Sequence, residues 1–334
     1  MSERPSVVFA LEARHLPLLF PPEVMSRLAA LADLGPGTVV DLRDPEALGL
    51  LAGVDVLITG WGCPPLGLDV LDAAPRLRAV LHTGGSVKYL LPPEGWDRGL
   101  VVSSAAAANA LPVAEYTLGM ILLSGKGVFE LRERFRAERS FVMGQVHRSV
   151  GNAGRRVGLI GASRIGRRVI ELLRPFDFDV LLHDPYVTRE EAHGLGVRKV
   201  DLAELLAMSD VVSVHAPATP ETRHLIGRAG LALMRDGAVL LNTSRGSLID
   251  HDALTEELVS GRLRAVLDVT EPEPLPAASP LYDLPNVLLT PHIAGSHGNE
   301  LRRLGLTAVE ELERFLAGRP LCHRVEHGDL HRAA

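Results

Sequence analysis

Residues 155–173, with the sequence RRVGLIGASRIGRRVIELL, decide the fold of this chain. A turn that holds a dinucleotide pyrophosphate has the pattern Gly-x-Gly-x-x-Gly between a strand and a helix. Here the three positions are occupied by Gly161, Ser163 and Gly166. The run RVGLIG before the turn is apolar and of strand length, and apolar residues recur at helical spacing after it. The stretch therefore predicts a strand, a phosphate-binding turn and a helix, with serine in place of the second glycine.

An acidic residue follows at the distance that a dinucleotide-binding fold requires. The next apolar run, DVLLHD, ends in Asp184, 23 positions after Gly161, where a carboxylate can accept hydrogen bonds from the ribose hydroxyls of an adenosine. Because a carboxylate repels a 2′-phosphate, Asp184 favours NAD over NADP, although His183 and Arg189 lie nearby. A helix start without a ligand is the alternative, and the position of Asp184 counts against it.

The serine in the turn has two interpretations. Its Cβ could hold the pyrophosphate further from the backbone and weaken the contact. Alternatively, the Ser163 hydroxyl could donate to a phosphate oxygen, assisted by the helix N-terminus and by Arg164. Under either interpretation the stretch predicts a bound dinucleotide.

The composition is that of a folded protein with two domains. The 334 residues exceed one ordinary core, and 46% hydrophobic with 23% charged residues excludes a disordered chain. The net charge of −6, without a basic face or tail, argues against nucleic acid or an anionic membrane as a partner. We expect no membrane span, since the apolar runs are of strand length, and no secretory signal.

The two cysteines indicate a reducing compartment. Cys63 and Cys322 have neither CxxC spacing nor a cluster of metal ligands around them. We therefore expect two reduced thiols, no metal site and a cytoplasmic protein.

Short apolar runs alternate with helical patterns along almost the whole chain. Such runs, bounded by glycine and separated by helices, predict parallel sheets that are buried on both faces and an α/β fold class. The first series lies at residues 6–11, 54–60, 77–85 and 99–104, and the second at residues 156–161, 179–184, 211–216, 238–244, 264–269 and 286–292. The six strands of the second series fit a doubly wound dinucleotide-binding domain.

Three helical patterns stand out. One covers residues 21–35, and an amphipathic one covers residues 299–320, with an end at Gly318 and Pro320 as a stop signal. The third, residues 109–136, is apolar nearly all round in its first half and strongly charged in its second. Its first half is therefore expected to be buried between domains or subunits.

Three segments at or near the ends of predicted strands carry the candidate catalytic residues. They are LLNTSRGSLID, AVLDVTEPEPLP and LLTPHIAGSH, and they supply Arg245, Glu273 and His292. Open α/β sheets bind their ligands at such strand ends. This set resembles the D-isomer-specific 2-hydroxyacid dehydrogenase family, which carries N-x-S-R-G, D-V-x-x-x-E-P and T-P-H-x-A-G in the same order. With VAEYTLGMILL and VGLIGASRIG, the resemblance covers residues 80–300 approximately.

Each of the three residues has a chemical role in the reduction of a 2-oxo acid. The planar fork of Arg245 can bind the substrate carboxylate and polarise the carbonyl. His292 can give a proton to the carbonyl oxygen in reduction or take it in oxidation, and Glu273 can stabilise the imidazolium. NADH supplies the hydride. Taken singly, the arginine could cap a helix or bind phosphate, the glutamate could be solvated, and the histidine could be structural.

The resemblance implies further cofactor contacts, from the phosphate turn, the acidic residue, the SVHAP segment and the arginine turn. The corresponding positions are Gly161, Ser163, Arg164, Ile165, Gly166, Asp184, His215, Ala216, Pro217, Thr222, Thr243, Ser244 and Asp268. By resemblance, Thr243 and Asp268 approach the nicotinamide. His215 could equally belong to an ordinary strand end.

The resemblance also implies the domain organisation. The family has two Rossmann-like, doubly wound domains, and the nucleotide domain is inserted into a discontinuous substrate domain. Residues 1–104 and 296–334 would then form the substrate domain and residues 105–295 the NAD-binding domain, with a cleft that closes over the substrate. The apolar half of residues 109–136 would contribute to a homodimer interface.

Departures from the family pattern occur mostly where the substrate should bind. Gly84, Gly85 and Ser86 occupy the loop whose backbone amides receive the substrate carboxylate. Lys88 adds a positive charge, which could meet a second anionic group or face solvent. Trp61 stands where phosphoglycerate dehydrogenases tend to place arginines, which counts against 3-phosphoglycerate and would suit an apolar or aromatic side chain.

The hypothesis that best fits these residues is an NAD-dependent D-2-hydroxyacid dehydrogenase that acts mainly as a reductase of a small 2-oxo acid. Alternatives with the same fold are a formate- or phosphite-type dehydrogenase and a nucleotide-sensing scaffold, like the transcriptional corepressors of this family. A scaffold would have extended tails or a peptide-docking surface, and neither is evident in the sequence. The intact set of Arg245, Glu273 and His292 favours turnover.

Overall fold

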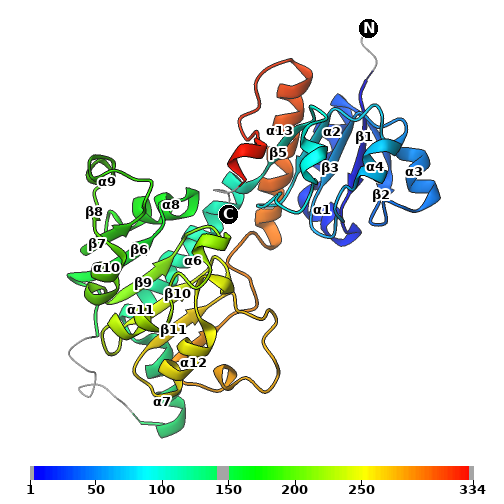
Figure 1. Cartoon of the computed structure of the whole chain (residues 1–334). Coiled ribbons are helices and arrows are strands. Elements are labelled where there is room, and N and C mark those ends of the chain that lie inside the picture. Colours follow the sequence, from blue (N-terminus) through cyan, green and yellow to red (C-terminus); the bar gives the residue numbers. More distant parts are fainter. Residues whose placement is uncertain (1–3, 141–149, 331–334) are drawn as a thin grey trace. The chain divides into compact units, whose positions relative to one another are not determined.

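The computed structural model describes residues 4–140 and 150–330, and the chain divides into two compact units (Figure 1). The terminal unit combines the two chain ends, Met1–Ala110 and Ser296–Ala333, and the central unit is Leu111–Gly295. The sequence predicts these divisions after residues 104 and 295. Each unit is described by itself below.

The terminal unit contains a five-stranded parallel sheet in the order β2-β1-β3-β4-β5. Alternate side chains of one central strand pack on opposite faces, Val7 and Phe9 with one core and Val8 and Ala10 with the other. Because both faces are covered, the inner strands consist largely of apolar residues and can be recognised in the sequence. The strands are β1 (Ser6–Ala10), β2 (Asp33–Thr38), β3 (Val56–Thr59), β4 (Ala79–His82) and β5 (Val101–Ser104).

Helices cover both faces of this sheet. On one face lie α2 (Pro22–Leu31) and α13 (Leu301–Leu316), and on the other α3 (Pro45–Leu51) and α4 (Leu68–Ala73). The short helices α1 (Leu16–Leu19) and α5 (Pro93–Trp96) belong to the same unit. The C-terminal helix α13 packs in the core formed by the first strands, so the two chain ends share one hydrophobic core.

Strand β2 is absent from the predicted strands because its sequence, DLGPGT, contains two glycines and a proline. These residues weaken a strand interior but are tolerated at a sheet edge, and β2 lies at the edge with an irregular register between Val7 and Phe9 of β1. A Cβ on Gly35 would lie 2.7 Å from Cγ2 of Val8. Glycine has a low strand propensity, but at position 35 the absence of a side chain allows β2 to lie close to β1.

The central unit contains a seven-stranded parallel sheet in the order β12-β11-β10-β9-β6-β7-β8. The chain starts in the middle at β6, builds outward through β7 and β8, and then returns to build the other side from β9 to β12. This order confirms the predicted doubly wound sheet, with its switch point between β6 and β9. The strands are β6 (Arg155–Ile160), β7 (Phe178–His183), β8 (Arg198–Lys199), β9 (Val211–Val214), β10 (Val239–Asn242), β11 (Arg264–Leu267) and β12 (Val287–Leu289). The two-residue strand β8 is too short to give an apolar run, and the sequence did not predict it.

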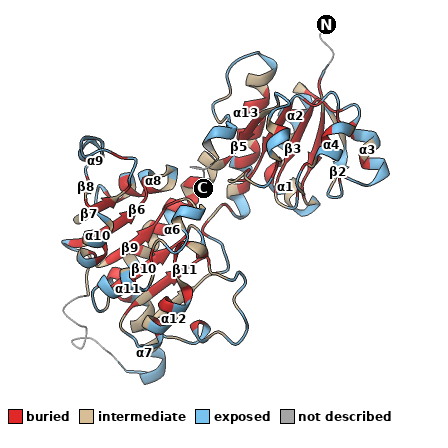
Figure 2. Ribbon diagram, viewed as in Figure 1, coloured by how far each residue is buried: buried red, intermediate tan, exposed pale blue. Residues whose placement is uncertain are grey.

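The inner strands of the central sheet are buried between two layers of helices (Figure 2). One layer contains α6 (Ala106–Gly125), α8 (Arg164–Leu173) and α9 (Arg189–Leu195), and the other contains α10 (Leu202–Met208), α11 (Arg228–Leu233) and α12 (His251–Val259). The short 3-10 helices of the chain are η1 (Ala13–His15), η2 (Pro220–Thr222), η3 (Gly246–Leu248), η4 (Pro280–Tyr282), η5 (Gly298–Glu300) and η6 (His327–Asp329).

The helical pattern over residues 109–136 forms two helices rather than one. The apolar half is α6, and the charged half is α7 (Val128–Glu138). Gly127 separates them with a φ of +62°, in the left-handed region that favours glycine. The change from apolar to charged residues in the sequence therefore marks a helix boundary.

Helix α6 also corrects the expectation that no segment is suited to a membrane span. By length and composition its 20 residues could cross a membrane. Ala114, Thr117 and Ile121 of this helix are fully buried, and both apolar residues belong to the core of the central unit. Burial in that core accounts for the apolar residues on this face of α6, and 33% of the apolar window is buried.

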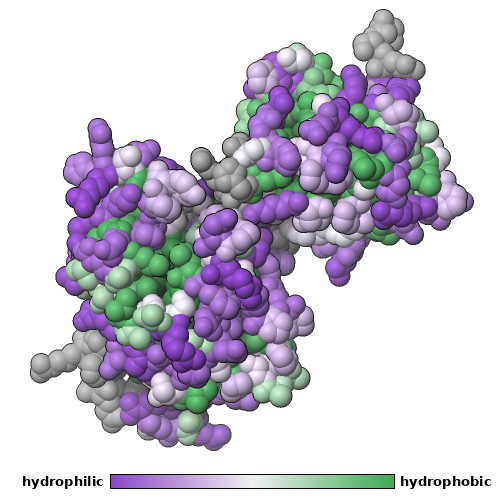
Figure 3. All heavy atoms as spheres, viewed as in Figure 1, coloured by the Kyte–Doolittle hydropathy of each residue, from purple (hydrophilic) through white to green (hydrophobic). Residues whose placement is uncertain are grey.

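Some apolar side chains remain at the surface. In the face drawn in Figure 3, hydrophilic atoms predominate, and apolar atoms gather near β6 and β9 of the central unit. On α6 and α7, the side chains of Leu123, Val128 and Phe135 are 38%, 37% and 51% exposed. These three residues, called the α6–α7 apolar surface below, are relevant to the oligomeric state.

Candidate active site

The serine of the phosphate turn is the N-cap of α8. The Gly166 amide donates to Ser163 Oγ at 3.3 Å, and the Ser163 backbone is extended. A serine N-cap stabilises a helix by about 1 kcal/mol relative to alanine, so this residue has a structural role that neither interpretation of the sequence had included. The hydroxyl proton is not used in the cap and is available to an acceptor at the helix N-terminus.

The two glycines of the turn are required by close packing. A Cβ on Gly161 would lie 2.8 Å from the amide nitrogen of Ala216, and a Cβ on Gly166 would lie 2.1 Å from the carbonyl oxygen of Gly161. Gly161 also has a φ of +97°. The turn therefore packs directly on the segment that follows β9, at the switch point where doubly wound sheets bind ligands.

The SVHAP segment, residues 213–217, packs against this turn through His215 and Ala216. The His215 imidazole is 1% exposed, and its Nε2 lies 2.9 Å from Ser213 Oγ. Burial lowers the pKa of His215 to about 4, so the ring is neutral at physiological pH. Its imidazole faces the protein interior, and Ala216 is also buried, whereas Pro217 is half-exposed. The hydroxyl of Thr222 donates to the Pro217 carbonyl at 2.7 Å and holds the end of the segment.

The predicted ribose-binding carboxylate lies beside the phosphate turn. Oδ2 of Asp184 accepts from the Ala162 amide at 2.7 Å, and Oδ1 accepts from the Tyr186 amide at 2.7 Å. Each carboxylate oxygen has a second lone pair, which leaves acceptor capacity for hydroxyl groups. Arg164 is exposed in the first turn of α8, and Ile165 is half-buried.

Arg245 lies in a turn at the end of β10. Asn242 Nδ2 donates to the Arg245 carbonyl at 2.8 Å, and Ser244 Oγ donates to the Val214 carbonyl at 2.7 Å. The turn is thereby tied both to its own strand and to the end of β9. The exposed guanidinium donates from Nη1 to the Ser244 carbonyl at 2.6 Å, and a guanidinium has five N–H groups in all.

The arginine turn packs against the loop that carries Glu273. A Cβ on Gly246 would lie 2.1 Å from both the carbonyl carbon and the carbonyl oxygen of Thr270. Only glycine fits at this position without movement of the backbone. The glycine of N-x-S-R-G therefore brings the loops of Arg245 and Glu273 into contact.

The structure joins the other two candidate catalytic residues directly. Nδ1 of His292 lies 2.6 Å from Oε1 of Glu273, and the two side chains are 48% and 40% exposed. A carboxylate can only accept, so Nδ1 carries the proton that is shared with Glu273. Nε2 is then the ring nitrogen that can exchange a proton with a ligand.

A buried carboxylate organises the loop around His292. Asp268 is 2% exposed; its Oδ1 accepts from Thr290 Oγ1 at 2.6 Å and from the Ile293 amide at 2.8 Å, and its Oδ2 accepts from the Ala294 amide at 2.9 Å. These partners flank His292, whose φ of +55° is strained for a residue with a side chain. Asp268, expected at the nicotinamide, thus makes its observed contacts with the histidine loop.

The predicted substrate loop follows β4 in the terminal unit. A Cβ on Gly84 would lie 2.5 Å from Nε2 of His82, so the loop packs on that ring. His82 is buried, its Nδ1 lies 2.9 Å from Thr59 Oγ1, and burial lowers its pKa to about 4. Gly84 is buried against this neutral ring, whereas Gly85 and Ser86 are half-exposed.

Trp61 follows strand β3 and Lys88 follows strand β4, and both side chains are partly exposed. Trp61 is half-buried; its ring centroid lies 5.4 Å from that of His15, and its carbonyl accepts from the Glu12 amide at 2.9 Å. Lys88 is half-buried rather than fully exposed. Trp61 therefore belongs to an aromatic pair at the carboxyl end of β3.

Sequence reasoning missed the polar contacts that reach the catalytic loops from α6. Tyr116 Oη lies 2.7 Å from Thr290 Oγ1, and Thr117 Oγ1 lies 3.3 Å from Thr243 Oγ1. The segment VAEYTLGMILL was used only for its apolar pattern. A polar pair within an apolar helix is the signal that could have identified them.

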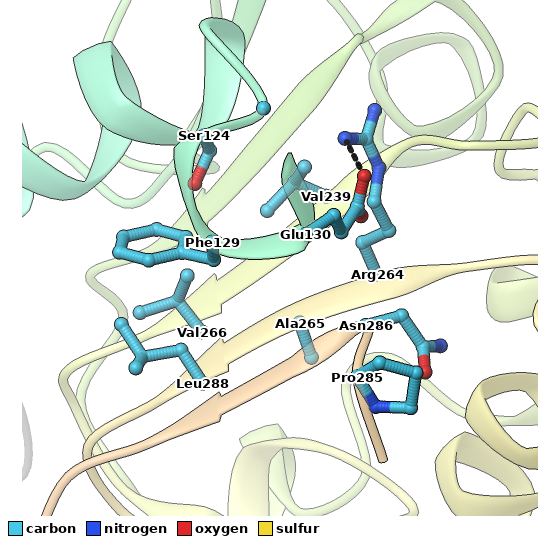
Figure 4. Close-up of a pocket in the computed structure, with 11 residues that line it drawn as sticks. Ser124, Phe129, Glu130, Val239, Arg264, Ala265, Val266, Pro285, Asn286 and Leu288 are labelled. Carbon is cyan, nitrogen blue, oxygen red and sulfur yellow. Dashed lines mark hydrogen bonds and ion pairs between the residues drawn. The ribbon is translucent and has the colours of Figure 1, made fainter. Parts of the chain in front are cut away.

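A small pocket lies away from these residues (Figure 4). Its lining includes the starts of β10, β11 and β12, with Arg264 bonded to Glu130 at 3.1 Å. The candidate catalytic residues follow the carboxyl ends of the strands, which is the opposite edge of the sheet. Among the residues that the structure describes, we find no group of three or more metal-ligating side chains.

The chain is similar to known proteins in sequence and in fold. Residues 118–294 match the family model described as D-isomer specific 2-hydroxyacid dehydrogenase, NAD binding domain. The chain is 34% identical over 283 residues to D-3-phosphoglycerate dehydrogenase of Methanocaldococcus jannaschii, which covers 83% of this chain and 52% of that protein. It is 32% identical over 278 residues to hydroxypyruvate reductase of Thermotoga maritima, which covers 81% of this chain and 88% of that protein.

A solved structure extends the similarity to the whole chain. A phosphoglycerate oxidoreductase from Rhizobium etli is 27% identical and has a TM-score of 0.81, over 97% of this chain and 99% of that one. The chain spans about half the length of the D-3-phosphoglycerate dehydrogenases that it matches in sequence. The matched domain, the identity to full-length relatives and the shared fold together show that the chain belongs to the D-isomer specific 2-hydroxyacid dehydrogenase family.

Proposed function

We propose that this protein is an NAD-dependent D-2-hydroxyacid dehydrogenase that acts mainly as a reductase of a small 2-oxo acid. The observation that carries the proposal is the 2.6 Å contact between His292 Nδ1 and Glu273 Oε1, next to the turn that carries Arg245. An imidazole held by a carboxylate beside an exposed guanidinium supplies both an acid and an anion-binding group.

Each of the three residues has a defined part in the reaction. Arg245 binds the substrate carboxylate through two parallel N–H bonds and so fixes the plane of the 2-oxo group. His292, as the imidazolium, gives its Nε2 proton to the carbonyl oxygen as that oxygen gains charge. Glu273 stabilises the imidazolium through Nδ1. NADH, when bound, supplies the hydride to the carbonyl carbon, so that 2-oxo acid, NADH and a proton give 2-hydroxy acid and NAD.

The residues of the phosphate turn fit a dinucleotide. The positions of Gly161 and Gly166 admit no Cβ, and the first turn of α8 presents free amide groups and the Ser163 hydroxyl proton. We assign Asp184 to the adenosine ribose and therefore favour NAD over NADP. Thr243 and Ser244 of the arginine turn and the segment 215–217 would line the rest of the cofactor site.

The proposed substrate lacks a phosphate group. We assign its carboxylate to Arg245, whose guanidinium is exposed at the end of β10. The aromatic pair of Trp61 and His15 supports an apolar or aromatic substituent rather than a phosphate. The names of the relatives, phosphoglycerate dehydrogenase and hydroxypyruvate reductase, support the wider class of small 2-oxo and 2-hydroxy acids.

We also propose a cytoplasmic homodimer formed through the α6–α7 apolar surface. Leu123, Val128 and Phe135 would be shielded from water by the second copy, which is the usual reason for apolar side chains to gather on a surface. Light scattering coupled to size-exclusion chromatography should give twice the chain mass of 35.9 kDa. A single-chain mass that persists at high protein concentration would contradict this assignment.

The activity can be tested by following NADH oxidation with a panel of 2-oxo acids of different size, including glyoxylate, hydroxypyruvate, pyruvate and phenylpyruvate. We expect turnover with at least one unphosphorylated acid and little turnover with the product of 3-phosphoglycerate oxidation. Tight NADH binding without turnover of any acid would instead indicate a nucleotide-sensing scaffold. Equal efficiency with NADPH would overturn the role of Asp184.

A further inference from the structure

Helix α6 reaches both catalytic loops through two adjacent hydroxyl groups. We propose that Tyr116 and Thr117 are positioning residues that set the orientation of His292 and Arg245 for the reaction. The proposal rests on the proposed function, since it assigns these residues to the same site. Neither hydroxyl needs to touch the substrate, because each acts through a threonine of a catalytic loop.

The contacts on the histidine side form a directed chain of hydrogen bonds. Tyr116 Oη lies 2.7 Å from Thr290 Oγ1, which lies 2.6 Å from Asp268 Oδ1. The ionised carboxylate can only accept, so the single hydroxyl proton of Thr290 points to Asp268. Thr290 must then accept from Tyr116. The tyrosine hydroxyl is therefore the outermost donor of the chain and fixes the rotamer of Thr290.

Protonation of Tyr116 is secure over the working pH range. Burial and the charge of Asp268 raise the pKa of Tyr116, whereas the bond to Thr290 lowers it by a smaller amount than burial raises it. The ring therefore remains a phenol, the form that can donate.

This series of hydrogen bonds ends at a strained part of the backbone, the loop that carries His292. Asp268 also holds the amides of Ile293 and Ala294, directly after His292, whose φ of +55° is strained for a residue with a side chain. Such a conformation persists only where the surroundings impose it. If Asp268 loses an ordered partner in Thr290, the histidine loop gains other conformations, and the 2.6 Å contact between His292 and Glu273 is populated less often.

On the arginine side, a single hydrogen bond links α6 to the turn that carries Arg245. Thr117 Oγ1 lies 3.3 Å from Thr243 Oγ1, and the two side chains are 0% and 7% exposed. Thr243 is two residues before Arg245 and directly after β10. In this dry environment, loss of one hydroxyl leaves the other without its partner, and the turn can relax.

Two features of α6 make it suited to this task. Ala114 and Ile121 of α6 belong to the core of the central unit and anchor the helix on either side of the two hydroxyls. Successive helix residues point about 100° apart, so adjacent positions can reach two different loops. The distance between His292 and Arg245 therefore depends on α6 as well as on the two loops that carry these residues.

The test compares Tyr116→Phe, Thr117→Val and Thr117→Ser with the wild-type enzyme, at the best 2-oxo acid of the panel. We expect Tyr116→Phe to lower kcat about tenfold while the KM for NADH stays within twofold, since the phosphate turn is not involved. Thr117→Val should raise the KM for the 2-oxo acid severalfold, and Thr117→Ser, which keeps the hydroxyl, should restore it. Tyr282→Phe, which removes an exposed hydroxyl bonded to the Leu275 carbonyl, is the matched control.

A second measurement does not depend on turnover. Hydrogen exchange of the Ile293 and Ala294 amides should become at least several times faster in Tyr116→Phe and remain unchanged in Tyr282→Phe. If both tyrosine variants have wild-type kcat and the loop amides exchange at the wild-type rate, the hydroxyl of Tyr116 is only structural and the proposal is wrong. If the wild-type chain turns over no 2-oxo acid, the proposed function fails, and the exchange result still decides whether Tyr116 orders the loop.

Discussion

His292 and Glu273 are bonded through Nδ1 and Oε1 at 2.6 Å, across a chain separation of 19 residues. The bond assigns opposite tasks to the two nitrogens of the imidazole: Nδ1 faces the carboxylate, and Nε2 is left for the substrate. Because both side chains are about half exposed, the pair is accessible to a ligand and is not a buried structural ion pair. The chemistry of the site follows from this orientation.

Replacement of Glu273 by glutamine should therefore weaken the acid without removing it. The amide can keep a hydrogen bond to Nδ1 but cannot stabilise an imidazolium by charge. We expect kcat for reduction to fall about 10- to 100-fold. Glu271→Gln, in the same loop but paired with Arg223, is the control. A wild-type kcat in Glu273→Gln would remove the glutamate from the mechanism.

Replacement of Arg245 by lysine tests whether geometry or charge binds the substrate. Lysine keeps the positive charge but cannot form two parallel bonds to a carboxylate. We expect the KM for the 2-oxo acid to rise at least tenfold while the KM for NADH changes little, as measured by initial rates at varied substrate. Arg228→Lys, an exposed arginine paired with Glu256, should behave as wild type. A similar KM in Arg245→Lys and wild type would show that only charge is needed.

Three variants of the phosphate turn separate the two roles of Ser163. Ser163→Ala should destabilise the protein by about 1 kcal/mol through loss of the N-cap, whereas Ser163→Gly should cost only a few tenths. If the hydroxyl also donates to a phosphate, both variants should bind NADH severalfold more weakly, and Ser163→Thr should bind it normally. Calorimetric titration with NADH and thermal unfolding measure the two effects. An NADH affinity that is equal in all variants would restrict the serine to helix capping.

Two buried histidines predict an acid-sensitive fold. Burial lowers the pKa values of His82 and His215 from 6.5 to about 4 in the folded protein. Below pH 6.5 the unfolded chain takes up protons that the folded chain does not, so the free energy of unfolding falls as pH falls from 6.5 toward 4. The loss is about 2 kcal/mol per histidine between pH 7 and pH 5.

Urea unfolding of His215→Gln at these two pH values tests that expectation. The variant should lose less stability than the wild type between pH 7 and pH 5, by about 2 kcal/mol. His193→Gln, at an exposed position in the last turn of α9, should keep the wild-type pH dependence. The interpretation would be wrong if His215→Gln and wild type lost equal stability.

Much of the fold could be predicted from the sequence because its strands are buried on both faces. Apolar runs such as residues 157–161 and 238–241 are separated by helical patterns, and this alternation predicts a doubly wound sheet. The exceptions have physical reasons. Strand β2 lies at an edge, where glycine and proline are tolerated, and the break after α6 depends on the left-handed backbone of Gly127.

The candidate site could be predicted in part. The three motifs identified Arg245, Glu273 and His292, and Asp184 was expected beside the phosphate turn, where it lies. The sequence could not reveal that Asp268 holds the histidine loop or that Tyr116 bonds to Thr290, 174 positions away. Such contacts depend on how α6 packs on the sheet, and local patterns carry no information about that packing.

The central claim, that His292 is the acid of a 2-oxo acid reductase, is tested most directly by one comparison of initial rates. Wild type and His292→Gln are assayed with NADH and the best 2-oxo acid of the panel, and the product is resolved by chiral chromatography. We predict a D-2-hydroxy acid from the wild type and a kcat about 10²- to 10⁴-fold lower for His292→Gln, with the same Kd for NADH. Equal rates for the two proteins, or a product of the opposite configuration, would contradict the account.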